Sequence, residues 1–85
     1  MNVYTVKFFA RCPRNGIRVE YTLTIERSEE DDADGHLLVE ELVDTVSLLD
    51  RGMHEELADQ LHREFGGRQT LVADHHGVTI KTVRE

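Results

Sequence analysis

The 85-residue sequence has no tryptophan, one proline, one cysteine and no long apolar run. Because Cys12 stands alone, no internal disulfide can form, and a single thiol is typical of a reducing compartment. No apolar stretch approaches the roughly 20 residues that a membrane-spanning helix needs. Residues 1–9 also lack the basic start and long apolar segment of a secretory signal. We therefore expect a cytoplasmic protein that does not contact a membrane.

Basic residues are also in the minority. The chain carries 10 Lys and Arg against 17 Asp and Glu, a net charge of −7. Nucleic-acid backbones attract basic surfaces, so we expect no direct binding to them. The composition is 39% hydrophobic and 32% charged, which is polar for a folded protein but above the range of disordered tails. A chain of this length supplies one small core, so residues 1–85 are predicted to form a single domain.

The first third of the chain predicts a β-hairpin. Residues 3–9 are rich in β-branched and aromatic side chains, which favour a strand. Residues 17–26 alternate strictly between apolar and polar, the pattern of a strand with one buried face; the apolar set is Ile17, Val19, Tyr21, Leu23 and Ile25. Asn15 and Gly16 between them favour the positive φ angles of a tight turn.

The remainder predicts two helices and a second pair of strands. After the acidic run 29–34, Asp34 is expected to cap a helix with a 3.6-residue apolar period, formed by Leu38, Val39, Leu42, Val43, Val46 and Leu49. Residues 50–52 break it. A second helix places Leu57, Leu61 and Phe65 on one face and ends at Gly66–Gly67.

Two short strands follow at residues 70–73 and 78–83, joined by a solvated turn at 74–77. The order of elements is thus strand, strand, helix, helix, strand, strand (β-β-α-α-β-β). This order predicts an α+β fold in which a four-stranded antiparallel sheet carries both helices on one face.

Two short segments carry residues suited to chemistry. Cys12 precedes the hairpin turn between Arg11 and Arg14, and positive charge stabilises a nucleophilic thiolate; alternatively, Cys12 ends a strand and packs as a small hydrophobe. Glu55 lies in the first turn of the second helix, where the helix dipole alone favours a carboxylate. A carboxylate that instead points into a pocket accepts paired N–H donors from a flat heterocycle.

These segments also carry a resemblance. The turn Cys12–Pro13–Arg14–Asn15–Gly16 resembles the nucleophile segment of the nitrile reductases that act on 7-cyano-7-deazaguanine. The pair His54–Glu55 is similar to the Phe-His-Glu motif of that family, and residues 76–80 are similar to its Gly-Gly-Ile-Ser-Ile strand. The predicted order of elements matches the tunnelling fold, which that family shares with pterin-forming enzymes. The start of the second helix is similar to their Glu-x-Leu-Ala motif.

The resemblance implies that Cys12 is a catalytic nucleophile and that His54 and Glu55 bind a purine- or pterin-like heterocycle. It also implies a homo-oligomer, which the two open edges of the predicted sheet favour independently. The chain departs from these families at Val19, where the reductases have an acid, and at residues 35–41, which replace their nicotinamide-binding segment. Asn15–Gly16–Ile17 replaces the zinc-binding His-x-His of the pterin synthases, so we predict no metal site and leave the cofactor open.

The acidic run supports two other interpretations, which stay open at this point. One is a non-enzymatic interaction or inhibitor module that docks on a basic partner through Glu29, Glu30, Asp31, Asp32 and Asp34. The other is a calcium-binding loop over residues 30–41, with glycine at position six and glutamate at position twelve. Against the calcium loop, the preceding residues predict a strand in place of the required helix, and Leu38 occupies the ninth position.

Overall fold

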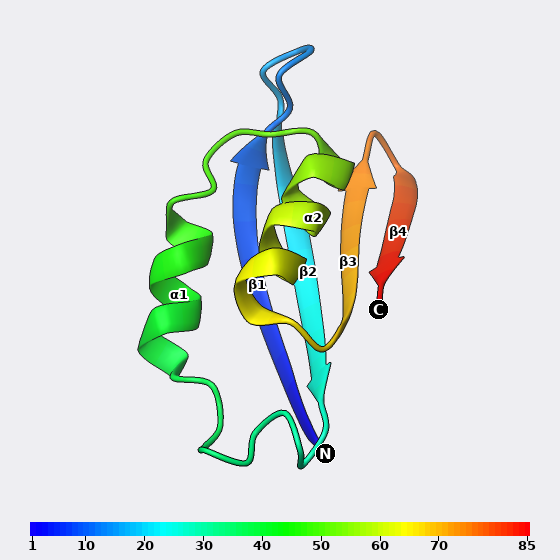
Figure 1. Ribbon diagram of the computed structural model, residues 1–85. Helices are drawn as coiled ribbons and strands as arrows, with labels where there is room; N and C mark the ends of the chain where they lie inside the picture. Colours follow the sequence, from blue (N-terminus) through cyan, green and yellow to red (C-terminus); the bar gives the residue numbers. More distant parts are fainter.

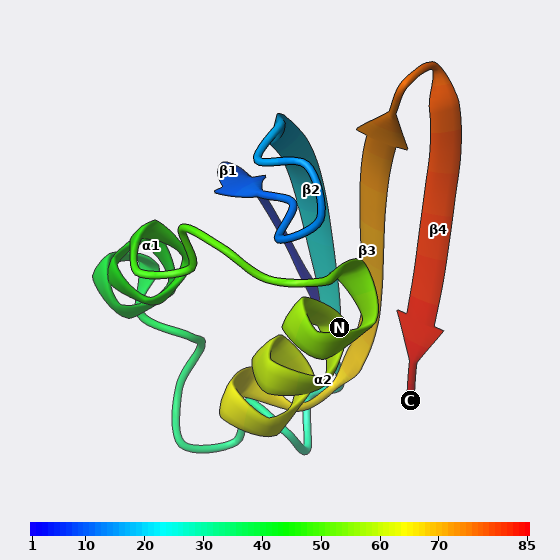
Figure 2. The same ribbon diagram turned by 90° about the horizontal axis from the view of Figure 1, so that it is seen from above.

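Four antiparallel strands form one sheet in the order β1-β2-β3-β4, and both helices lie on the same side of it (Figures 1 and 2). The computed structural model describes all residues, 1–85. The elements are β1 (Asn2–Arg11), β2 (Arg18–Arg27), α1 (Val39–Ser47), α2 (His54–Phe65), β3 (Arg68–His75) and β4 (Val78–Arg84). The predicted α+β fold and its order of elements are confirmed. Neither helix has the length and apolar character needed to span a bilayer.

The β1–β2 hairpin is formed much as its alternation predicts. The strands pair from Asn2 opposite Arg27 to Arg11 opposite Arg18, and the inward side chains of β2 are buried. Ile17 is the exception: it lies before β2 and is exposed, so its predicted place in the core is wrong. The expectation that both Asn15 and Gly16 take positive φ angles in the turn is only half correct. Only Gly16 takes a positive φ, whereas the side chain of Asn15 accepts a hydrogen bond from the Ile17 N–H.

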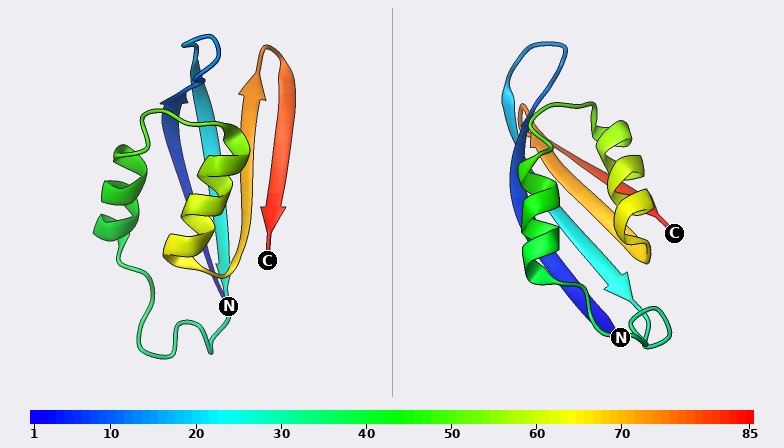
Figure 3. Two further views of the ribbon diagram at one scale, coloured as in Figure 1. Left: turned by 45° about the horizontal axis from the view of Figure 1, so that its top comes forward. Right: turned by 60° about the vertical axis from the view of Figure 1, so that its left-hand side comes forward.

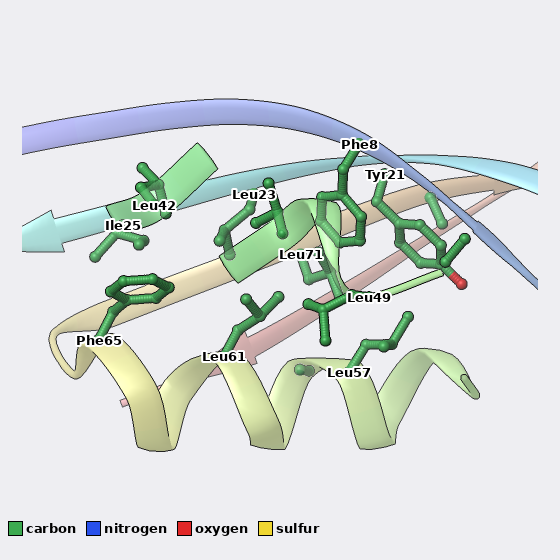
Figure 4. Close-up of a cluster of buried hydrophobic side chains, with 14 of the residues drawn as sticks. Phe8, Tyr21, Leu23, Ile25, Leu42, Leu49, Leu57, Leu61, Phe65 and Leu71 are labelled. Carbon is green, nitrogen blue, oxygen red and sulfur yellow. The ribbon is translucent and has the colours of Figure 1, made fainter. Parts of the chain in front are cut away.

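The main core lies between α2 and the inner face of the sheet, as Figure 4 shows. Leu57, Leu61 and Phe65 of α2 are all buried, as their spacing predicts. The buried amide of Gln69 donates hydrogen bonds to the carbonyls of Leu61 and Gly66. Gln69 therefore fastens the end of α2 to the start of β3.

Helix α1 starts later than predicted. It begins at Val39, and Leu38 is an N-cap without a side-chain hydrogen bond. Asp34 cannot cap it, because Gly35 has a φ of 122° and interrupts the chain between them. The loop before α1 is instead fastened to β1, since the Tyr4 hydroxyl accepts the N–H of Leu37.

The predicted core of α1 is only partly correct. Leu42, Val46 and Leu49 are buried as expected. Leu38, Val39 and Val43 were expected beside them, yet all three are exposed. In Figure 3, α1 covers the β1 side of the sheet and stands apart from α2. This position gives α1 too little neighbouring surface to cover its whole apolar stripe.

The second hairpin is longer than predicted. β3 and β4 pair from Gln69 opposite Arg84 to His75 opposite Val78. The turn between them consists of His76 and Gly77, both with positive φ, as a two-residue hairpin turn requires. The prediction of a solvated turn over residues 74–77 is therefore wrong for Asp74 and His75, which belong to β3.

Candidate functional site

A cavity of about 200 Å³ lies at the N-terminal end of α2. Its polar lining comes from the hairpin loop, β2, α2 and β3, and consists of Cys12, Arg14, Tyr21, His54, Glu55 and His75. Its apolar wall includes Val19, Ala73 and Ile80. A mostly apolar hollow with a few convergent polar groups is the usual form of a small-molecule site.

All three residues singled out in the sequence line this cavity. Cys12 is half-buried, and His54 is 8% exposed. Glu55 is exposed and lies at the rim. Its neighbour Glu56 is equally exposed but does not line the cavity. The structure therefore brings together a thiol, an imidazole and a carboxylate from two distant segments.

Main-chain contacts hold the two segments together. The Arg11 N–H donates to the Asp50 carbonyl at 2.8 Å, and the Gly52 N–H donates to the Arg11 carbonyl at 3.2 Å. A Cβ at Gly52 would lie 2.8 Å from Leu57 Cδ2, so only glycine allows this close approach without a shift of Leu57. The start of α2 is thereby placed beside Cys12.

Two main-chain hydrogen bonds close the hairpin loop, and its two neighbouring arginines point to different places. The Cys12 N–H donates to the Ile17 carbonyl, and the Cys12 carbonyl accepts the Gly16 N–H. Arg14 lines the cavity, whereas the Arg11 guanidinium donates to the Gly16 carbonyl. Of the two arginines that flank Cys12 in the sequence, the structure places one at the cavity.

His54 is a buried imidazole without a hydrogen-bond partner at either ring nitrogen. Its ring packs at a tilt against Tyr21, with 5.6 Å between the centroids. Burial lowers the pKa of His54, and the charge of Glu55 opposes this only in part. His54 is therefore neutral at pH 7, with one ring nitrogen that can donate and one that can accept.

Tyr21 lines the same cavity and was assigned only a core position from the sequence. Its ring stacks on Phe8, with 5.1 Å between the centroids. Burial raises the pKa of Tyr21, and the nearby Cys12 and Glu55 raise it further. The phenol therefore stays protonated and can act as a neutral donor in the cavity.

His75 was missed because the predicted strand ended at Ala73. It lines the cavity, and its Nε2 is buried without a partner. A signal was present: Leu71, Ala73 and His75 follow the two-residue period of one strand face. Extending the strand by two residues would have pointed His75 inward.

The acidic loop has a different geometry. A wide-open hollow of about 760 Å³ lies beside it, and only one of its nine lining residues is hydrophobic. We regard this hollow as a surface depression, because a binding cavity is normally enclosed and apolar. No three His, Cys, Asp or Glu side chains are placed to hold a metal ion. Asp32, the third position of the calcium-loop pattern, accepts hydrogen bonds from Arg27, Asn2 and Tyr4.

Comparisons of the chain with protein-family models, curated proteins and solved structures gave no match.

Proposed function

We propose that the cavity at the start of α2 binds a flat nitrogen heterocycle of the purine or pterin class. In this proposal, Glu55 accepts N–H donors from one edge of the ring, and Cys12 is a nucleophile beside it. The observation that supports it is that Cys12, His54 and Glu55 line one small cavity. The motif resemblance assigns roles to the same three residues.

The surroundings of Glu55 suit such a ligand. A carboxylate offers two oxygens in one plane, so it can accept two parallel N–H bonds from a heterocycle. Its place at the rim would orient the polar edge of the ring, while the apolar wall contacts the ring face. The neutral His54 and Tyr21 supply donors, and His54 an acceptor, for the remaining heteroatoms.

The chemistry proposed for Cys12 is addition to a nitrile. The thiolate sulfur forms a bond to the nitrile carbon, one C–N π bond breaks, and the nitrogen takes up a proton to give a covalent thioimidate. This step consumes no oxidant or reductant. Reduction to an amine would require a hydride donor, and residues 35–41 replace the nicotinamide-binding segment of the resembled family. We therefore limit the proposal to binding and addition.

We further propose that this cytoplasmic domain works as a tunnelling-fold-like homo-oligomer. β4 is an edge strand with an unpaired side. Val78 and Ile80 on its helix-facing side are 62% and 36% exposed, and Ile80 belongs to the cavity wall. A second copy paired along this edge would cover these side chains and help to close the cavity. Sedimentation of the purified chain tests this directly: a monomer at all concentrations contradicts it.

Incubation with 7-cyano-7-deazaguanine followed by intact-mass measurement tests the function. We expect the mass to rise by one full nitrile molecule, and we expect no rise for Cys12→Ser. Glu55→Gln should weaken binding by about tenfold or more, because a charged acceptor of two hydrogen bonds is lost. Glu56→Gln is the matched control, because this adjacent carboxylate does not line the cavity.

Two outcomes would contradict the proposal. One is the absence of both an adduct and calorimetric binding for every purine and pterin tried. The other is an equal loss of affinity for Glu55→Gln and Glu56→Gln, which would assign the effect to net charge. Circular dichroism of each variant establishes that the fold is intact.

A further inference from the structure

The negative charge of the chain is concentrated in one segment. Residues 28–50 contain nine of the 17 acidic residues and none of the 10 Lys and Arg. The other 62 residues hold eight acidic and ten basic side chains, so they carry a small positive charge. The net negative charge of the chain therefore comes from the loop before α1, from α1 itself and from the residues just after it.

The carboxylates of the loop are partly engaged within the molecule. Asp31 accepts the Ser28 N–H, and Asp32 is paired with Arg27. The acidic residues of α1 are different. The ion pairs of the structure join Arg27, Arg68 and Arg84 to carboxylates outside α1. Glu40, Glu41 and Asp44 are exposed and belong to none of them.

An exposed apolar ridge runs beside these carboxylates. Val39 and Val43 are 61% and 49% exposed. They stand four residues apart, so they are neighbours on one helix face. Glu40 and Asp44 have the same spacing and form the adjacent ridge. α1 makes close backbone contacts with β1 and with no other helix or strand. Figure 2 accordingly shows α1 at one side of the molecule, away from α2.

We propose that this face of α1 binds a basic amphipathic helix of a partner protein. Apolar side chains of the partner would pack on Val39 and Val43, and its Lys or Arg would pair with Glu40 and Asp44. A second copy of α1 is the poorer occupant, because its own carboxylates would face Glu40 and Asp44. This surface is separate from the cavity of the proposed heterocycle site, so the two proposals are independent.

A synthetic helical peptide with a leucine stripe flanked by lysines is the probe. We expect it to bind the full chain, as measured by fluorescence anisotropy, and to bind more weakly as salt is raised. The double variant Val39→Ser/Val43→Ser should weaken binding by about tenfold or more, because most of the buried apolar area is lost. Glu40→Gln/Asp44→Asn should weaken it and reduce its salt dependence.

Val3→Ser is the matched control, because it makes the same exchange at another exposed valine. Val3 is 55% exposed in β1, and strand alternation places it on the opposite face of the sheet from Phe8, Ala10 and the helices. We expect this variant to bind the peptide as the unsubstituted chain does. All these positions are exposed, so thermal melts should show that each variant still folds.

Four results would overturn the proposal. These are no binding at peptide concentrations of about 100 μM, equal loss for Val3→Ser and the Val39→Ser/Val43→Ser variant, and equal binding of a peptide with glutamates in place of the lysines. The fourth is self-association of the chain that the valine variant abolishes, which would make a second copy the occupant. Substitution of Cys12 or Glu55 should not change peptide binding, so failure here is distinguishable from failure at the cavity.

Discussion

The two helices have similar apolar patterns but different surroundings. α2 buries Leu57, Leu61 and Phe65 completely or nearly so. α1 buries Leu42 and Val46 but leaves Val39 and Val43 in solvent. α2 makes its closest backbone contacts with β3 and β4, whereas α1 makes them with β1. In Figures 1 and 3, α2 lies in front of the middle of the sheet and α1 lies at its β1 side.

This difference shows that the apolar period of a helix does not by itself decide how much of its apolar stripe is buried. A 3.6-residue period shows that a helix has an apolar stripe. The width of the stripe that becomes buried depends on the surface opposite it. The helix over the middle of the sheet meets side chains from several strands, and the helix at the side meets few. The first helix thus keeps an exposed apolar ridge, and the start of the second lines the cavity.

The largest difference should appear on truncating one apolar side chain in each helix. Leu61 is 0% exposed, and Leu61→Ala should lower the free energy of unfolding by about 2–5 kcal/mol, because it leaves a cavity in the core. Val43→Ala should change it by about 0.5 kcal/mol or less, since Val43 is already exposed. Urea unfolding measures both. If Val43→Ala lowers the free energy of unfolding as much as Leu61→Ala does, the Val43 face of α1 must be buried in solution.

The buried imidazole at the start of α2 should make stability depend on pH. The pKa of His54 is lowered in the folded state because burial disfavours its charged form. The unfolded chain therefore binds more protons near its usual pKa of about 6.5. The free energy of unfolding should be greatest above about pH 7 and should fall as the pH drops through 6.5.

Urea unfolding between about pH 8 and pH 5 measures this loss. His54→Gln cannot titrate and should remove much of it. His36→Gln, at an exposed position before α1, is the control and should keep the dependence. If the free energy of unfolding of His54→Gln falls with decreasing pH as steeply as that of the unsubstituted chain, His54 is not the cause of the pH dependence.

A smaller dependence of stability on pH is expected from the acidic loop, where Asp32 accepts hydrogen bonds from β1 and β2. Hydrogen bonds from Asn2 and Arg27 lower the pKa of Asp32 to about 2. Its contribution should be complete above the unfolded pKa of about 3.9 and lost as the pH falls through about 2. Asp32→Asn should therefore be less stable than the unsubstituted chain at pH 7, and the difference should vanish toward pH 2.

Unfolding curves at pH 7, 4 and 2 check this expectation, with the exposed neighbour substitution Asp34→Asn as the control. Equal destabilisation by the two substitutions would show that the effect comes from net charge and does not depend on the hydrogen bonds of Asp32.

Much of the fold was predictable because its signals are local. The alternation from Val19 to Ile25 and the spacing of Leu57, Leu61 and Phe65 both agree with the structure. The local errors have local causes as well. Gly35 takes a positive φ that separates Asp34 from α1, and the pattern of β3 continues to His75 beyond the point where the strand was expected to end.

The candidate site was predictable only as separate pieces. The motifs indicated Cys12, His54 and Glu55, but not the cavity that they line together with Tyr21 and His75. Nor did the sequence indicate that Glu55 lies at the rim, or that both ring nitrogens of His54 lack partners. These properties depend on how α2 approaches the hairpin loop, which the contacts between Arg11 and Gly52 decide.

The sequence by itself determined the order of the elements, the α+β class, the inward face of β2 and the apolar face of α2. Each of these follows from residues within a few positions of one another. The tertiary structure decided which part of α1 remains exposed, and it joined the thiol, imidazoles and carboxylate around one cavity. Such features depend on contacts between distant segments, where packing and burial, more than local periodicity, set the outcome.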